Sequence, residues 1–306
     1  MSSVTELADQ LKESGDPAVA LQLLSATTAR SHVEAALSAL KRAVLDDNAR
    51  PVLRDRFNFY MDHIDKDRGT TLREALVKLL VGIGHPDDLD LYLRAVSVYE
   101  SVPPAIQIDV AQKLRAAALA GAAEIDSELA QLYAVKLLSE IADTSDFSSE
   151  PALTALNLLV RYQRWQPIYQ YLLMVGGYKP EYADVVSRAL EAFEADFPAP
   201  LYTAAAERFI DRDQPVELTG IIGYIVERRR ADLYPLLEQI VSATRNSDLH
   251  RYALIQMAAA RDRALNTLVF TLAKRAPLEY LPNFIEALEL IPNSEEILNL
   301  LRTRTR

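Results

Sequence analysis

Apolar residues recur at intervals of three and four along nearly the whole chain, which is the spacing of one face of an α-helix. Residues 33–45 and 53–64 are typical examples. The string DLDLYLRA at 88–95 also alternates as a strand would, but its helical spacing continues to Tyr99, and the greater length favours a helix. The pattern therefore predicts about 18 helices and no β-strand.

The expected helix ends rest on short polar and glycine motifs. Ser31 with Glu34, and Thr71 with Glu74, have the spacing of a capping box, so each pair predicts a helix start. Gly84, at the end of the string GIG, predicts a helix C-cap.

Prolines mark further helix starts, because proline is tolerated in the first turn of a helix but not in its interior. Two series of them recur at steps of 33 to 35 residues, which is about the length of two helices and two turns. The series are Pro17, Pro51 and Pro86, and Pro167, Pro200 and Pro235.

Two-helix units of this size cannot bury their apolar faces alone, so they must stack on one another. The sequence therefore predicts an all-α fold, a right-handed α-solenoid of about nine antiparallel helix pairs with no β-sheet. Residues 1–306 are expected to form a single continuous array, with a weak sub-boundary near 143–150, where the polar run DTSDFSS is the candidate linker.

In this respect the chain resembles the HEAT and armadillo repeat families. The resemblance rests on helices that end in an apolar string and continue through a short turn, such as GHPDDL at Gly84–Leu89. A string beginning at Phe284, FIEALELIPNSEEILNLL, is similar to the second helix and junction of a tetratricopeptide repeat, but it covers one unit only. The resemblance implies a helical-repeat fold and transfers no functional residue.

Composition narrows the class of protein. Half of the 306 residues are hydrophobic and a quarter are charged, as in ordered soluble proteins. The absence of cysteine excludes disulfides and thiolate chemistry. The first residues lack the pattern of a signal peptide, and the longest apolar stretch without a charge, Trp165–Tyr178, is shorter than the roughly 20 residues of a membrane span. We therefore expect a cytoplasmic protein with no membrane partner.

The sequence lacks the recognised catalytic and metal-binding motifs. None of the four histidines has a second histidine or a glutamate at a metal-pairing offset of three or four. The run DHIDKDRG, beginning at Asp62, lacks the first carboxylate and the glycine of a calcium loop, so it is interpreted as a solvated helix end. No glycine-rich phosphate loop or nucleophile motif occurs. The sequence predicts no metal, no cofactor and no enzymatic activity.

The most distinctive stretch lies between Pro151 and Tyr182, where six aromatic residues, including the only tryptophan, fall within 21 positions. Amphipathic rings of this kind anchor protein interfaces, although they also fill helix cores. The leading hypothesis is a non-catalytic scaffold that binds another protein or peptide on the concave face of the array. Its predicted contact residues are Tyr162, Trp165, Tyr169, Tyr171, Arg161 and Arg164.

An alternative hypothesis rests on residues 228–275, which contain nine basic side chains and four acidic ones. Arg229, Arg251, Arg261 and Arg263 would then hold nucleic-acid phosphate or an acidic peptide. Some HEAT-like solenoids are DNA glycosylases, so this activity is a further version of the alternative. The net charge of −10 argues against a nucleic-acid partner.

Overall fold

The computed structural model describes residues 3–101, 109–140, 149–174 and 182–304. These ranges contain 18 α-helices and no β-sheet, so the all-α prediction is confirmed. Their one extended pairing is an isolated antiparallel bridge between Ser101 and Asp109. None of their helices combines the length and the apolar character needed to cross a membrane.

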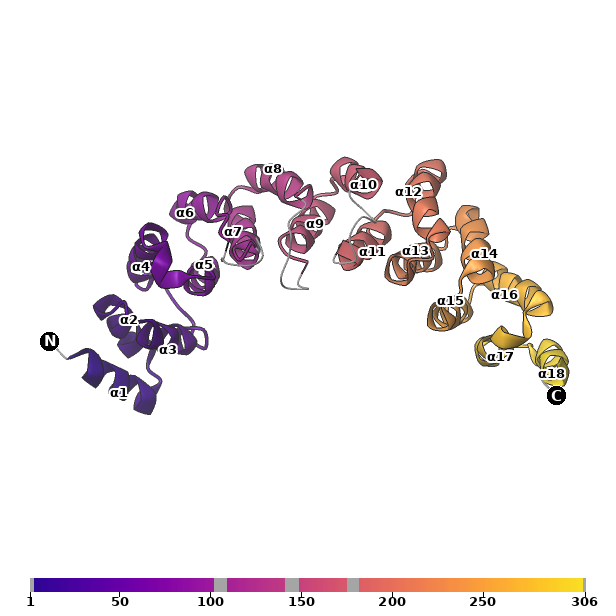
Figure 1. The fold of residues 1–306 in the computed structure, drawn as a ribbon, viewed down its shortest axis with the longest axis horizontal. Coiled ribbons are helices and arrows are strands. Elements are labelled where there is room, and N and C mark those ends of the chain that lie inside the picture. Colours follow the sequence, from indigo (N-terminus) through magenta and orange to yellow (C-terminus); the bar gives the residue numbers. More distant parts are fainter. Residues whose placement is uncertain (1–2, 102–108, 141–148, 175–181, 305–306) are drawn as a thin grey trace. The chain divides into compact units, whose positions relative to one another are not determined.

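The chain divides into two compact units, Met1–Gln163 and Arg164–Arg306, which we call unit 1 and unit 2 (Figure 1). The sub-boundary expected near 143–150 falls almost wholly outside the described residues and stays a prediction.

Unit 1 consists of helices in two layers. Its first layer contains α2, α4, α6 and α8, and its second layer contains α3, α5, α7 and α9, while α1 packs on α2. Each first-layer helix packs on the second-layer helix that follows it in the chain (Figure 1). The bounds are α1 Val4–Ser14, α2 Pro17–Ala26, α3 Arg30–Leu40, α4 Arg50–Asp62, α5 Thr71–Ile83, α6 Leu89–Ala95, α7 Gln112–Ile125, α8 Ser127–Leu138 and α9 Ala152–Arg161.

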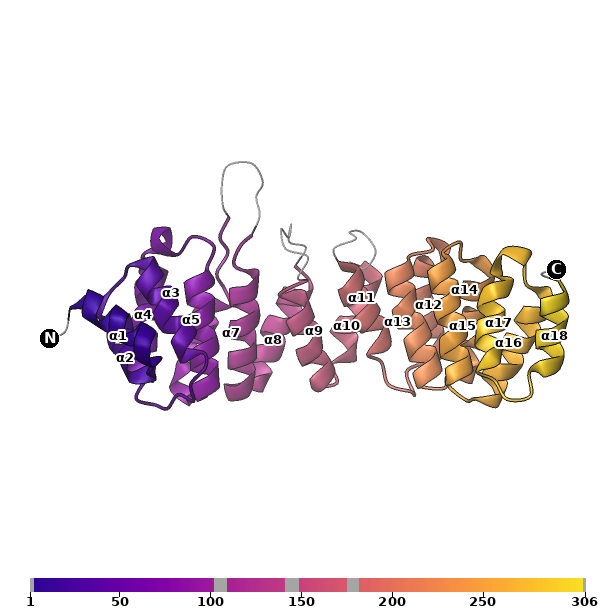
Figure 2. The same cartoon turned by 90° about the horizontal axis from the view of Figure 1, so that it is seen from below.

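Unit 2 repeats this arrangement. Here α10, α12, α14, α16 and α18 form the first layer, and α11, α13, α15 and α17 form the second (Figure 1). Neighbours within each layer pack side by side (Figure 2), as stacked helical repeats require. The bounds are α10 Trp165–Met174, α11 Ala183–Glu191, α12 Ala199–Asp211, α13 Pro215–Glu227, α14 Tyr234–Ala243, α15 Ser247–Ala259, α16 Arg263–Arg275, α17 Leu281–Glu289 and α18 Glu295–Arg304.

Several predicted helix ends are confirmed and two are wrong. Prolines do occupy the first turn of α2, α4, α12, α13, α14 and α17, and Gly84 ends α5 in the left-handed conformation. The capping box expected at Ser31 is absent, because α3 begins at Arg30 and the guanidinium of that residue bonds the Glu34 carboxylate at 2.7 Å. Thr71 is likewise the first residue of its helix and not its cap.

The start of α5 is held by Asp67, which is completely buried. One carboxylate oxygen accepts the backbone N–H of Leu72, and the other accepts both the backbone N–H and the Nε–H of Arg73, each at 3.0 Å. The equally buried Arg73 also donates from Nη2 to Glu100, at 2.7 Å. The interpretation of this segment as a solvated helix end is therefore wrong for Asp67.

A second buried arginine repeats the motif 42 residues later. Arg115, at the start of α7, pairs with Asp109 at 2.5 Å and donates to the carbonyl of Val98 at 2.8 Å. Its guanidinium lies over the ring of Tyr99, 4.3 Å from the centroid. In both motifs the acid precedes the arginine by six residues, so the same short sequence pattern begins two successive second-layer helices.

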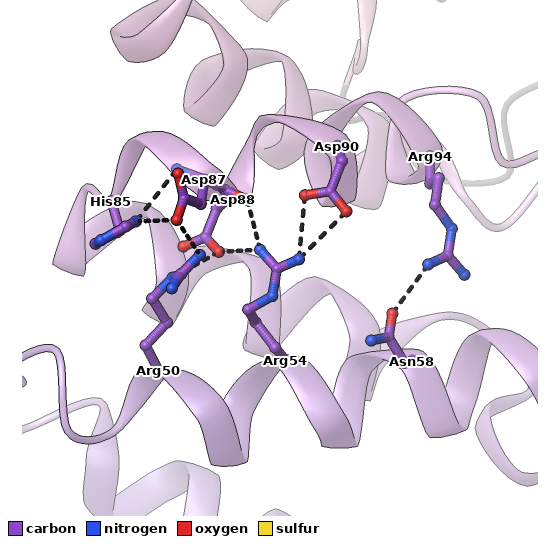
Figure 3. A network of polar contacts seen from close by, with 8 residues as sticks. All are labelled: Arg50, Arg54, Asn58, His85, Asp87, Asp88, Asp90 and Arg94. Atoms are coloured by element: carbon purple, nitrogen blue, oxygen red, sulfur yellow. Dashed lines mark hydrogen bonds and ion pairs between the residues drawn. The ribbon is translucent and has the colours of Figure 1, made fainter.

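A third polar network joins α4 to the segment that leads into α6 (Figure 3). Asp88, which is fully buried, accepts from Nε of Arg50 at 2.9 Å and also from Arg54. Arg54 reaches Asp90 at 3.1 Å as well. Because the two arginines are four residues apart, they lie on one face of α4, and this face is thereby fixed against the next repeat.

In unit 2, α11 and α13 make the most extensive helix packing among the described residues. Gly220 permits it, since a Cβ atom there would overlap the carbonyl group of Ser187 on α11. One turn further, a Cβ at Gly223 would lie 2.7 Å from a carboxylate oxygen of Glu191, the mobile end of a flexible side chain. The two glycines of α13 therefore differ in how strictly the packing requires them.

We predict that Arg73→Leu lowers the free energy of unfolding of unit 1 by about 3–5 kcal/mol, because it leaves the buried carboxylate of Asp67 without its cation. Urea denaturation followed by circular dichroism measures the change. Arg68→Leu, at an exposed neighbouring position, is the control and should cost less than about 0.5 kcal/mol. Equal effects of the two substitutions would contradict the structural role of Arg73.

We also predict that Gly220→Ala costs at least about 2 kcal/mol, because backbone cannot move aside as a side chain can. Gly223→Ala should cost less than about 1 kcal/mol, since the Glu191 side chain can rotate away and alanine favours helix. Thermal melts of both variants test this difference. A Gly220→Ala protein as stable as the Gly223→Ala protein would show that α11 and α13 do not approach so closely.

Candidate functional site

An open trough crosses α5, α7 and α9 in the second layer of unit 1. It consists of two adjoining depressions of about 290 and 190 Å³, which share Ala120 and Thr154 as lining residues. Lys78 and Val81 of α5 form one wall, and Asn157 and Leu158 of α9 line the far part. We call this feature the alanine trough.

The trough follows from the sequence AAALAGAA at 116–123 in α7. A Cβ atom at Gly121 would meet the side chain of Val81 at 2.7 Å and the ring of Tyr92 at 2.9 Å, so only glycine allows this packing. Ala120 is exposed on α7, and its methyl group is too short to fill the space between the helices. Small residues therefore both draw the helices together and leave the depression open.

Charged groups lie at both ends of the alanine trough. At one end, Nζ of Lys78 bonds Glu74 at 2.6 Å, and an oxygen of Glu150 accepts the backbone N–H of Thr154 at 3.1 Å. At the other end, Arg161 of α9 bridges to Glu124 of α7 at 2.9 Å. The result is an apolar floor between polar rims of mixed charge, a composition typical of protein-binding surfaces.

The predicted aromatic contact residues are divided between the two units. Arg161 and Tyr162 belong to unit 1, where Arg161 lines the alanine trough and its guanidinium lies 5.6 Å from the centroid of the Tyr162 ring. Arg164, Trp165, Tyr169 and Tyr171 belong to unit 2. The six residues therefore fall into a pair in unit 1 and a group of four in unit 2.

The unit 2 group is engaged mainly in packing. Trp165 contacts Phe193 and Tyr169 contacts Phe197, with ring centroids 6.1 and 5.8 Å apart, and both remain partly exposed. Tyr171 is only 3% exposed, and burial raises the pKa of its hydroxyl. Tyr171 therefore adds nothing to an exposed surface, while Arg164 is exposed just before α10. Tyr178, also in the predicted cluster, lies outside the described residues.

The arginines of 228–275 occupy different environments. Arg230 is buried and donates to Asp232 at 2.7 Å and to the hydroxyl of Tyr224 at 2.5 Å. Arg251 forms a two-pronged bridge to Glu286 from the middle of α15, with distances of 2.6 and 2.5 Å.

The other three predicted anion-binding arginines lie at turns. Arg229 and Arg261 are exposed residues with left-handed φ angles of 51° and 52°, in the turns after α13 and α15, and Arg263 is the first residue of α16. Of the four, Arg251 alone lies within the body of a helix, and it forms an ion pair with Glu286. The four arginines are therefore not one set of unpaired cations, because Arg251 is paired with Glu286.

The histidines and carboxylates of the described residues add no candidate metal site. Within the described ranges, no group of three or more His, Cys, Asp or Glu residues could hold a metal ion. His250 is 1% exposed and stacks on Tyr280, with centroids 4.2 Å apart. Burial lowers the pKa of His250 to about 4, so the ring is neutral near pH 7.

Comparison with known proteins gave no relative: no family model matches the chain, and no curated protein or solved structure does so either. The resemblance to the HEAT and armadillo families stays a prediction. The alanine trough was missed at the sequence level, although the run AAALAGAA at 116–123 was its visible signal.

Buried His250 makes the stability of unit 2 dependent on pH. The unfolded chain takes up a proton near pH 6.5 that the folded state accepts only near pH 4. The stability contributed by neutral His250 is therefore full above about pH 6.5 and is lost as the pH falls towards 4. We predict a loss of about 2 kcal/mol at pH 5 relative to pH 7.5.

The variant His250→Phe should lack this part of the pH dependence, because phenylalanine does not titrate. Urea denaturation of both proteins at the two pH values measures the difference. Other groups titrate equally in both, and among them Glu191 and Glu217, whose pKa values burial raises, act in the opposite direction. Identical pH dependence in the two proteins would refute the role of His250.

Proposed function

We propose that the protein is a non-catalytic, cytoplasmic scaffold of the HEAT and armadillo type, which binds a partner protein on the exposed side of its second-layer helices. The observation that carries this proposal is the alanine trough. It lies on consecutive helices of a stacked layer, where repeat proteins have room for an extended partner.

The size of the trough favours a polypeptide partner over a small molecule. Small-molecule pockets are typically about 300–1,000 Å³ and enclose most of their ligand, whereas the two depressions measure about 290 and 190 Å³ and are open. Each suits one or two inserted side chains. Burying a side chain of leucine size contributes roughly 1.5–3 kcal/mol, so useful affinity requires contacts with several helices of the layer.

At the edge of the trough, Arg161 adds a charged hydrogen-bonding group to the apolar floor. Its guanidinium lies 5.6 Å from the ring centroid of Tyr162, and arginine and tyrosine are among the residue types enriched in binding hot spots. This part of the aromatic hypothesis is retained. Trp165 and Tyr169 belong to unit 2, where they pack against Phe193 and Phe197, and they are no part of the alanine trough.

The nucleic-acid alternative has weaker support. Arg230 and Arg251 already have carboxylate partners, and a phosphate-binding surface needs several free cations in one groove. A glycosylase would further need a carboxylate beside an open aromatic cleft, whereas Trp165 packs against Phe193. We therefore retain protein binding as the proposed function.

The proposal predicts that a photo-crosslinker at Asn157, on the α9 wall of the trough, captures a defined partner in cells that express the protein. Ala120→Phe should abolish the adduct by filling the trough. The same crosslinker at Leu132, an exposed position on first-layer α8, is the control. Mass spectrometry of the adducts identifies the partner.

Three results would count against the alanine trough as the binding surface. They are the absence of any adduct from position 157, an adduct that survives Ala120→Phe in a folded protein, and the same adducts from position 132. Circular dichroism establishes that the Ala120→Phe protein is folded.

A further inference from the structure

A second groove lies between α1 and α3 at the beginning of unit 1. Its volume is about 570 Å³, larger than either part of the alanine trough. One face of α1 and one face of α3 line it, and small residues such as Ala8, Gly15 and Ala35 form most of its surface. We call it the α1/α3 groove.

The groove exists because α1 and α3 are not packed together. α1 packs on α2, and α2 packs on α3, but α1 and α3 make only marginal contact. From α3 onward, by contrast, consecutive second-layer helices of unit 1 do pack on each other. The gap is therefore specific to this end of the unit and exposes two helix faces that are covered in the other repeats.

Charge distinguishes this groove from its surroundings. Its lining includes Lys12, His32 and Arg42, and no carboxylate. Residues 1–150 as a whole carry more acidic than basic side chains, so a groove without an acid is a local exception.

The basic groups of the groove are available to a ligand. Lys12 has only a loose contact with Asp9, at 3.7 Å between two exposed side chains, and such pairs contribute little. Arg42 is exposed and has no ion pair in the described part of the chain. Nδ1 of His32 also lacks a hydrogen-bond partner there, but it is buried, so Lys12 and Arg42 are the accessible cations of the groove.

We propose that the α1/α3 groove binds an acidic peptide segment of a partner protein. Carboxylates of the peptide pair with Lys12 and Arg42, and its small apolar side chains lie over the alanines. The inference concerns a separate surface and does not depend on the alanine trough.

The dimensions of the groove favour a peptide over a free anion. The α3 residues that line it run from Ser31 to Ala39, a rise of about 12 Å along a helix. An extended peptide advances roughly 3.3 Å per residue, so about four residues fit. A single small anion would occupy one end and leave the apolar surface uncovered.

The test is selection from a phage-displayed library of random peptides on the purified full-length protein. Wild type should enrich peptides rich in Asp and Glu. The charge-reversal variant Lys12→Glu/Arg42→Glu should lose this enrichment. A selected peptide should also bind at least about tenfold more weakly when its Asp and Glu are replaced by Asn and Gln, as fluorescence anisotropy measures.

Two controls make the result specific. Lys41→Glu changes an exposed lysine next to Arg42 that does not line the groove, and it should retain the selection. Ala120→Phe should retain it too, so failure here and failure of the trough proposal are distinguishable. The proposal is overturned if acidic peptides are not enriched, if Lys41→Glu abolishes enrichment as the double variant does, or if only a labelled oligonucleotide binds.

Discussion

The buried ion pair of Asp67 and Arg73 is the interaction on which the architecture of unit 1 most depends. One aspartate satisfies the free N–H groups at the start of a helix and also neutralises a fully buried guanidinium. That guanidinium in turn reaches Glu100 beyond α6. A single pair thus begins a helix and fixes the segment that follows it, which is why stacking is specified by polar groups as well as by apolar area.

Close packing and buried polar groups occur in both units, on different residues. In unit 1, buried arginines begin α5 and α7, and small residues, Gly121 among them, line α7. In unit 2, the close contact at Gly220 and the stacked rings of Tyr202 and Tyr224, 4.3 Å apart, fit neighbouring helices together, and the buried arginine is Arg230. The two units therefore share a layered arrangement that different residues stabilise.

Helical periodicity and proline positions were sufficient to predict the helices, because both act within a single element. Contacts between elements could not be predicted in the same way. Nothing in the local sequence indicates that Asp67 would turn inward to Arg73, since that depends on burial by neighbouring repeats. The same holds for the aromatic cluster. Tyrosine is a residue type common at interfaces, but the tertiary packing of unit 2 buries Tyr171 in the core. The alanine run of α7 is visible in the sequence, but whether it forms a depression depends on the positions of α5 and α9, which the run itself does not specify.

The packing of Trp165 against Phe193 has a practical consequence. The chain has one tryptophan, so indole emission reports the contact of α10 with Phe193 in unit 2. Circular dichroism registers the helices of both units. A difference between the two signals during denaturation would therefore show, without any added label, that this contact is lost at another point than the helices as a whole.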